Sequence, residues 1–389
     1  MKFKTATETA FCAAFFFLPV SKPLMFASLL AAFLLFIASG YFVRAKQSWR
    51  TLPWVMPALI LCVLPWLSLF VHEDLNLGLA KLGLSYYWIL AFVTFLAASQ
   101  MPILPWLRAF LCGVFIAFCY AMIHMAGWLT TGSKPSALGN SILFSQFLAT
   151  AIVLLSILYK HDSHRSRKRL YLIGMCLFFL GLMLGEGRSG ILAVVVLFPL
   201  IFTNILKQKN RAKIIAMCLI ASSILVMSPM VRSRIQAGVN DLQLFQKNET
   251  QTSLGYRFDM WSTAWNVFLE NPIIGAGPSG FRHAWVNHPR SAEAAAFLEP
   301  HNAFLFYASS YGVIGLAALI WLYAALVWTG WANRQSLEGA VVFVFAVIGV
   351  LGSFTNTMVM GTASHALFML FIGLQGGLLY TSRHNGKNP

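Results

Sequence analysis

Charged side chains are scarce in this chain of 389 residues. Asp, Glu, Lys and Arg together make up 10% of it, against about 25% in a typical soluble domain. Acidic residues are the rarer sign, with 12 Asp and Glu against 28 Lys and Arg. This composition excludes an ordinary soluble fold, because too few charged groups remain to cover its surface.

Motifs for metals and nucleotides are also missing. The six cysteines lie in apolar runs, with no CxxC pair and no metal-ligand spacing, so we expect neither a disulfide nor a zinc site. The chain has no Walker A motif, no GxGxxG after a strand, no HExxH and no Asp-x-Asp pair. We therefore expect no metal and no cofactor, and a metal-bound nucleotide sugar is an unsuitable donor.

Long apolar runs are abundant instead, and 58% of the residues are hydrophobic. About 20 apolar residues cross the roughly 30 Å core of a bilayer, and a helix satisfies its own backbone there. The sequence therefore predicts an all-α polytopic membrane protein with about twelve transmembrane helices, forming a single integral membrane domain over residues 1–389. The expected spans cover residues 8–20, 23–43, 53–71, 79–99, 103–128, 138–159, 170–186, 189–206, 212–230, 302–330, 337–357 and 362–381.

Basic residues predict the orientation, because cytoplasmic loops of membrane proteins are enriched in Lys and Arg. With the expected spans, 18 of the 28 basic residues fall on the side of the termini and ten on the other. The densest stretches are KHDSHRSRKR at 160–169 and KQKNRAK at 207–213. Both termini are therefore predicted to be cytoplasmic. The net charge of +16 reflects this topology rather than a nucleic-acid partner.

One large polar segment interrupts the apolar runs, at residues 231–301 between spans nine and ten. The predicted orientation makes it a large periplasmic loop. Residues 256–270 place aromatic side chains on one helical face, which predicts an amphipathic helix at the membrane interface. After a glycine-rich turn at 275–278, a second helical stretch is expected over about 280–297.

Two arginines are candidates for binding a phosphate group. Arg188 stands in the glycine-rich break GEGRSG at 185–190, and Arg257 opens the amphipathic helix. A planar guanidinium suits phosphate oxygens, so the two would form a cationic clamp. The alternatives are that Arg188 snorkels or pairs with Glu186, and that Arg257 is an ordinary surface charge.

His301 is the candidate general base. It follows Pro300 at the N-terminal end of the expected span, where the helix dipole disfavours a protonated imidazole. An interfacial histidine bonded to the backbone is the alternative. Asn302 would either orient a substrate or cap the helix. Arg282 and His283 are further candidates for contacts with the substrate.

Four motifs occur in a fixed order along the chain, GRSG at 187–190, YRFDMW at 256–261, NPIIGAGPSGF at 271–281 and HNAFLFYASSYGVIGL at 301–316. In this order, on a chain of about twelve spans, they resemble the O-antigen ligase and polymerase superfamily over about residues 170–320. The size and layout are most similar to O-antigen ligase.

The resemblance implies an inverting, metal-independent transfer of a glycan from undecaprenyl pyrophosphate to lipid A-core oligosaccharide. The reaction would take place at the periplasmic face of the bacterial inner membrane, on an architecture related to the GT-C glycosyltransferases. The phosphate-binding arginines of the family correspond to Arg188 and Arg257, and its essential histidine to His301. The family often has Ser where this chain has Gly187, after Glu186, so the role of Glu186 stays open.

Three other functions remain open. A polysaccharide polymerase would extend another lipid-linked repeat with the same donor, and the single long loop favours a ligase over it. An O-linked protein oligosaccharyltransferase usually carries an extra soluble tail, whereas this chain stops soon after the last expected span. A glycolipid transporter would need discontinuous polar spans and internal symmetry, and no matching half is found. The sequence does not predict the glycan, the acceptor sugar or the oligomeric state.

Overall fold

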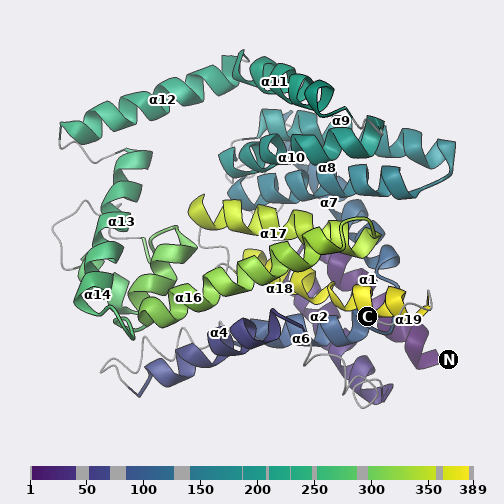
Figure 1. Ribbon diagram of the computed structural model, residues 1–389, viewed down its shortest axis with the longest axis horizontal. Coiled ribbons are helices and arrows are strands. Elements are labelled where there is room, and N and C mark those ends of the chain that lie inside the picture. The colour runs from purple at the N-terminus through teal and green to yellow at the C-terminus, as the bar shows by residue number, and fades with distance from the viewer. Residues whose placement is uncertain are drawn as a thin grey trace.

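Helices form all of the regular structure in the described residues. The computed structural model describes residues 2–40, 52–70, 85–126, 141–185, 187–206, 210–227, 229–247, 252–286, 297–355 and 362–384. Its helices, in chain order (Figure 1), are α1 (Lys2–Phe17), α2 (Lys22–Ala38), α4 (Val55–Ser68), α6 (Tyr87–Ala98), α7 (Leu104–Met125), α8 (Ser141–His161), α9 (Arg165–Leu184), α10 (Arg188–Leu206), α11 (Arg211–Met227), α12 (Pro229–Gln246), α13 (Ser253–Glu270), α14 (Gly280–Val286), α16 (Ala303–Ala332), α17 (Leu337–Thr355), α18 (Thr362–Gly373) and α19 (Gly376–His384).

Several of these helices can cross a membrane. In the described part of the chain, five apolar stretches are long enough, namely α7, α8, α16, α17 and residues 364–382. Shorter apolar helices cover α2, α4, α6 and most of α10 and α11. The prediction of an all-helical, multi-pass membrane protein is confirmed. The number of twelve spans stays a prediction.

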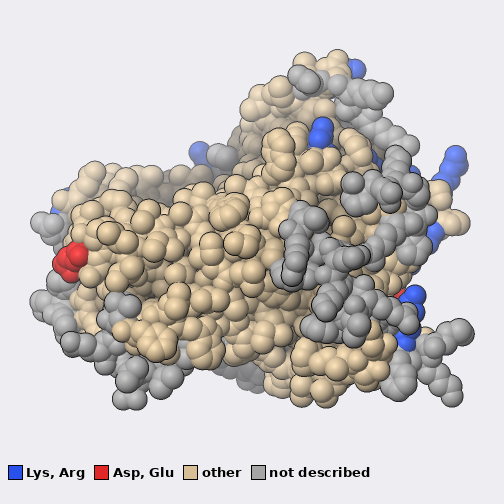
Figure 2. All heavy atoms as spheres, turned by 60° about the horizontal axis from the view of Figure 1, so that its bottom comes forward, with Lys and Arg blue, Asp and Glu red and all other residues tan. Residues whose placement is uncertain are grey.

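The surface of the molecule is suited to a hydrocarbon environment. Uncharged side chains cover most of the face in Figure 2, and most of the few charged ones lie near its outline. Large apolar side chains point outward from the helices, among them Leu30 and Trp328, which are 59% and 71% exposed. Lipid tails solvate such side chains at no cost, whereas water would not.

The helix α8 lies at the centre of one part of the bundle. Its Ser145 Oγ lies 3.4 Å from Ser189 Oγ of α10, and its Ser156 Oγ accepts a hydrogen bond of 3.3 Å from Asn204 Nδ2 further along α10. The two helices therefore run parallel, and α9 leads the chain back from the end of α8 to the start of α10. Hydroxyl and amide pairs of this kind hold helices together where apolar contacts alone give little preference.

The first two helices form a separate hairpin against α7. Residues 18–21 turn the chain between α1 and α2. The rings of Phe11 and Phe15 stack on Trp106 of α7, with centroids 4.7 and 5.9 Å apart. All three side chains are buried, so these contacts attach the hairpin to the main core.

Two expected spans are interrupted. The last expected span, at residues 362–381, is divided into α18 and α19 by a turn at residues 374–375. Residues 302–330, expected to be one helix, contain a break at Gly312, which has φ 63° and ψ −157°. In the loop segment, α14 covers Gly280–Val286 of the stretch expected to be helical over about 280–297, and residues 287–296 lie outside the described part.

Candidate functional site

The helix α13 carries Arg257 and is fixed at both ends. At its start the Thr252 side chain accepts a hydrogen bond of 3.0 Å from Gly255 N, a standard N-cap. One turn after Arg257, Trp261 Nε1 donates a bond of 3.0 Å to the carbonyl oxygen of Pro300. Since residues four apart share a helix face, Arg257 lies on the side of α13 that meets the segment before α16.

A small hydrophobic cluster, separate from the main core, supports this region. We call it the loop core; its buried members are Met260, Ala264, Phe281 and Trp285. The rings of Phe281 and Trp285 stack with centroids 5.8 Å apart on α14. Tyr256, Trp261, Phe297 and Leu305 pack around it. The loop core thus joins α13, α14 and the beginning of α16 into one unit, at the left of Figure 1.

Phe297 is where several predicted site residues meet. Its ring lies 5.9 Å from the Tyr256 ring, next to Arg257, and 5.6 Å from the His301 ring. Its carbonyl oxygen accepts a hydrogen bond of 3.4 Å from Arg282 Nη1. Arg282 therefore holds the backbone of the segment just before His301.

His301 occupies a strained position directly before α16. Its φ of 49° is the only positive φ of a non-glycine residue in the described part of the chain. Its Nδ1 lies 4.0 Å from Glu299 Oε1, and its side chain is 30% exposed. A strained, partly exposed histidine beside a carboxylate is a typical arrangement at a reactive site.

Asn302 caps α16. Its Oδ1 accepts a hydrogen bond of 3.2 Å from Leu305 N, and the residue is 6% exposed. Of the two predicted roles, capping is therefore observed. A contact with a substrate would use the side-chain Nδ2 group instead.

Arg188 is the first residue of α10, and the glycines beside it are packed against α8. A Cβ on Gly187 would lie 2.2 Å from Ser145 Oγ, and one on Gly190 would lie 2.3 Å from the Ser145 carbonyl oxygen. Ser145 Oγ also accepts a bond of 3.3 Å from Gly190 N. The backbone at Arg188 is thus held against α8, while its side chain and Glu186 lie outside the described part.

The start of α10 and the start of α16 lie at the same end of the bundle. Lys160, at the last turn of α8, bonds Gln335, just before α17, so α8 and α17 are antiparallel. Because α10 is parallel to α8, its first residues lie beside the last residues of α17. Phe354, in that last turn, is 4.7 Å from Phe304 of α16, ring to ring. Arg188 and His301 therefore flank the same end of α17.

The structure brings together most, not all, of the predicted residues. Arg282 and His301 meet at Phe297, and the helix that carries Arg257 is bonded to Pro300. His283 is exposed on α14. Sequence reasoning missed three residues that link the site. For one of them, Glu299, the sequence contained a local signal, namely its position two residues before His301. The missed residues are Trp261 as a bonding group, Phe297 and Glu299.

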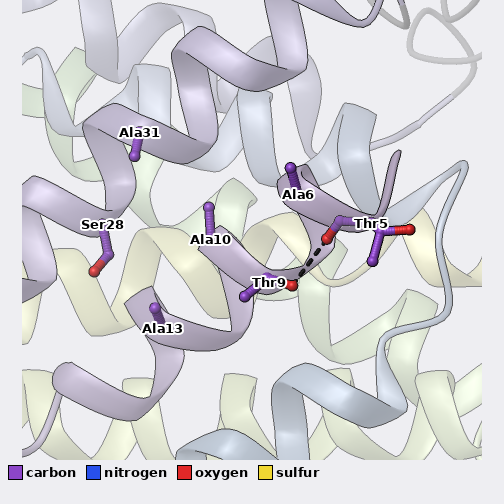
Figure 3. A pocket seen from close by; sticks show the side chains of 7 residues that line it. All are labelled: Thr5, Ala6, Thr9, Ala10, Ala13, Ser28 and Ala31. Atoms are coloured by element: carbon purple, nitrogen blue, oxygen red, sulfur yellow. Dashed lines mark hydrogen bonds between the residues drawn. The ribbon is translucent and has the colours of Figure 1, made fainter. Parts of the chain in front are cut away.

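A hollow in the described part of the molecule lies away from this group of residues. This hollow has a volume of about 690 Å³ and lies between α1 and α2 (Figure 3), at the end of the bundle opposite α13 and α14 in Figure 1. The Thr9 hydroxyl beside it is bonded to the Thr5 carbonyl oxygen of its own helix. Among the described residues, no group of three or more His, Cys, Asp or Glu could hold a metal ion. The residues that line the hollow are small, namely Thr5, Ala6, Thr9, Ala10, Ala13, Ser28 and Ala31.

A known family matches the part of the chain that carries the candidate site. Residues 173–320, from α9 to the middle of α16, match the family described as O-antigen ligase. Over these residues the chain is similar to the O-antigen ligase family. Every candidate residue, from Arg188 to Asn302, lies inside the matched segment.

Individual relatives agree with the family. The chain is 23% identical over 221 residues to the O-antigen ligase of Escherichia coli, covering 53% of this chain and 51% of the relative. It is 32% identical over 89 residues to the O-antigen ligase of Salmonella typhimurium, 22% of each chain. An uncharacterized protein of Haemophilus influenzae is 29% identical over 174 residues, 42% of this chain and 44% of the relative. The chain thus spans about half or less of the length of these relatives.

Proposed function

We propose that this protein acts as an O-antigen ligase and transfers a glycan from undecaprenyl pyrophosphate to lipid A-core oligosaccharide. The observation that carries the proposal is the arrangement around His301. A strained histidine beside Glu299 shares one end of the bundle with the first residue of α10, Arg188. The family segment supplies the reaction class for that arrangement.

The proposed setting is the bacterial inner membrane. The excess of basic residues on one side favours cytoplasmic termini and about twelve spans, which would turn residues 231–301 toward the periplasm. ATP and nucleotide sugars do not reach that side, so a donor carried by a membrane lipid suits the site. A GT-C-like arrangement of the spans is part of the same proposal.

The arginines would hold the diphosphate of the donor. Guanidinium groups bind phosphate oxygens in a bidentate manner and stay charged at all relevant pH values. Arg188 and Arg257 would neutralise the charge that develops on the diphosphate as it leaves, without a metal ion. Arg282, His283 and the Nδ2 group of Asn302 would contact the diphosphate or the sugars.

His301 would act as the general base. Its Nδ1 faces Glu299, so we assign proton acceptance to the other ring nitrogen, Nε2. The acceptor hydroxyl gives its proton to Nε2 while its oxygen bonds to the anomeric carbon. The bond from that carbon to the phosphate oxygen breaks, and undecaprenyl pyrophosphate leaves. Direct displacement of this kind inverts the anomeric centre.

The test is transfer by the purified full-length chain in nanodiscs, with lipid-linked glycan and lipid A-core and without ATP or metal. We expect a covalent product, and a loss on the order of 10²–10⁴-fold for His301→Ala, the range of a lost general base. Arg257→Lys should also lose activity, because Lys cannot form the bidentate contact. His164→Ala and Arg232→Lys, at exposed positions outside the site, are the matched controls.

The same assay separates the other functions. Elongation of the lipid-linked glycan without use of lipid A-core would indicate a polymerase, and a glycosylated protein acceptor an oligosaccharyltransferase. Relocation of the donor without a new covalent bond would indicate a transporter. Full activity of His301→Ala would exclude the assigned base.

A further inference from the structure

The break in α16 is a sharp bend. Phe304 and Tyr323 lie on opposite sides of Gly312, and their ring centroids are 6.0 Å apart. On a continuous helix, residues this far apart in sequence would be separated by about 28 Å. Residues 303–311 therefore fold back toward residues 313–332, and Phe304 packs against the last turn of α17 as well.

A helix break releases backbone groups that need new partners. Here the partners come from the turn that follows α13. The carbonyl oxygens of Ser309 and Ser310 accept hydrogen bonds from Ala276 N and Gly277 N, at 2.8 and 3.0 Å. In the other direction, Val313 N donates a bond of 2.8 Å to the Pro272 carbonyl oxygen. We call the paired segments 272–277 and 309–313 the latch.

At two positions of the latch, a Cβ atom would collide with the backbone of the opposite segment. Gly275 and Gly312 have φ of 73° and 63°, which L side chains rarely adopt. A Cβ on Gly275 would lie 2.3 Å from the carbonyl carbon of Ser310, and a Cβ on Gly312 would lie 2.2 Å from the carbonyl oxygen of Ile273. Both contacts are with backbone, so no side chain can move aside. Each glycine is needed for the opposite segment to approach.

The latch fixes the segment that carries His301 to the helix that carries Arg257. At one end Trp261 of α13 is bonded to Pro300, directly before His301. At the other end the turn after α13 is bonded to residues 309–313. Residues 300–313 thus lie alongside α13 with an attachment at each end, and His301 lies just inside one of them.

We propose that Gly275 and Gly312 are positioning residues, which set the place of His301 relative to Arg257 through the latch. The inference rests on the proposed role of His301 and Arg257 in glycan transfer. Neither glycine touches the substrate. A small displacement of a general base from its reacting group is enough to slow a reaction on the order of 10²-fold, so the latch matters to the rate rather than to binding.

The test compares Gly312→Ala and Gly275→Ala with Gly238→Ala in the full-length protein. Gly238, on α12, is the matched control, because the nearest atom to an added Cβ is 3.7 Å away. We expect kcat for transfer to fall at least tenfold in both latch variants, with the KM for the acceptor within about twofold of the wild type. The control variant should keep the kcat of the wild type.

Amide hydrogen exchange reports the latch without reference to catalysis. Peptides covering 272–278 and 309–316 should exchange slowly in the wild type and rapidly in the latch variants, while peptides of α8 stay protected. Pro272→Gly adds no atom and keeps the carbonyl that Val313 bonds, so it serves if the alanine variants do not fold. It should loosen the same peptides partially and reduce kcat by a smaller factor.

The outcomes are distinct. Loss of protection together with loss of kcat supports the proposal. Loss of protection with an unchanged kcat, or a fall in kcat with the latch still protected, overturns it. A wild-type protein without transfer activity would overturn the proposed function and the positioning role together, while its exchange pattern would still report whether the latch forms.

Discussion

Two helix breaks flank the candidate site, and they are held in different ways. The break before α10 is packed against α8, where a side chain and a backbone carbonyl of Ser145 meet Gly187 and Gly190. The break at Gly312 in α16 is paired, backbone to backbone, with the turn after α13. The first is thus supported by the main bundle and the second by the loop. Arg188 and His301, on either side of the site, have separate supports.

The independence of the two supports can be tested most strongly at the break before α10, which packs against α8. In Gly190→Ala the added Cβ would meet the Ser145 carbonyl oxygen, which cannot move without shifting α8. We expect transfer activity to fall on the order of 10²-fold and the thermal unfolding midpoint to drop. Gly187→Ala mainly meets the Ser145 side chain. Ser145→Gly should therefore partly rescue Gly187→Ala and leave Gly190→Ala unrescued; equal rescue of both would contradict this geometry.

The loop side should respond to loss of the loop core. Trp285 is 1% exposed and stacks on Phe281, so Trp285→Ala should cost about 3–5 kcal/mol within that unit. Hydrogen exchange should accelerate in α13 and α14 and stay unchanged in α8. Trp265→Ala is the control, because Trp265 lies on α13 of the same unit but is 46% exposed. Faster exchange throughout the bundle would mean that the two supports are not independent.

A smaller effect is expected where the part of α16 after the bend is bonded to α17. Tyr323 Oη lies 2.6 Å from Ser353 Oγ and donates to the Gly349 carbonyl oxygen at 3.2 Å. Tyr323→Phe removes the hydroxyl and should cost about 1–3 kcal/mol, measured as a lower unfolding midpoint. In a double-mutant cycle with Ser353→Ala, the combined loss should be smaller than the sum of the two. Strict additivity would show that the two hydroxyls do not interact.

The smallest effect is expected at the turn between α8 and α9, far from both breaks. The backbone N–H of His164, followed by Tyr171 and Arg167, holds the pKa of Asp162 below its usual range. A lowered pKa in the folded state stabilises the protein above the ordinary carboxyl pKa of about 3.9, and this stabilisation is lost as the pH falls through the lowered value. Asp162→Asn should therefore be less stable than wild type at pH 7, with transfer activity unchanged there, and the difference in stability should shrink as the pH falls below the ordinary carboxyl pKa. A difference that persists in acid would contradict this.

The helices were predictable from sequence because their cause is local. Each of the twelve apolar runs overlaps a helix, and the aromatic face of residues 256–270 corresponds to α13. The bend at Gly312 was not predictable in this way. A glycine in an apolar run usually continues the helix, and its reason for bending, the turn at 272–277, lies far away in the sequence. For the same reason the roles of Phe297 and Trp261 become visible only when α13 and α16 are seen together.

The bend in α16 also brings His301 back toward the apolar rod formed by residues 313–332. The apolar stretch counts as one segment of 30 residues, but only residues 313–332 after the bend form a straight rod, of about 30 Å, the thickness of a hydrocarbon core. A straight helix would carry His301 about 17 Å beyond residue 312. Folded back, the same segment lies beside Phe354 at the end of α17. The proposed base would there meet the proposed donor, a sugar whose phosphates are tethered to a lipid, without the lipid having to rise out of the bilayer.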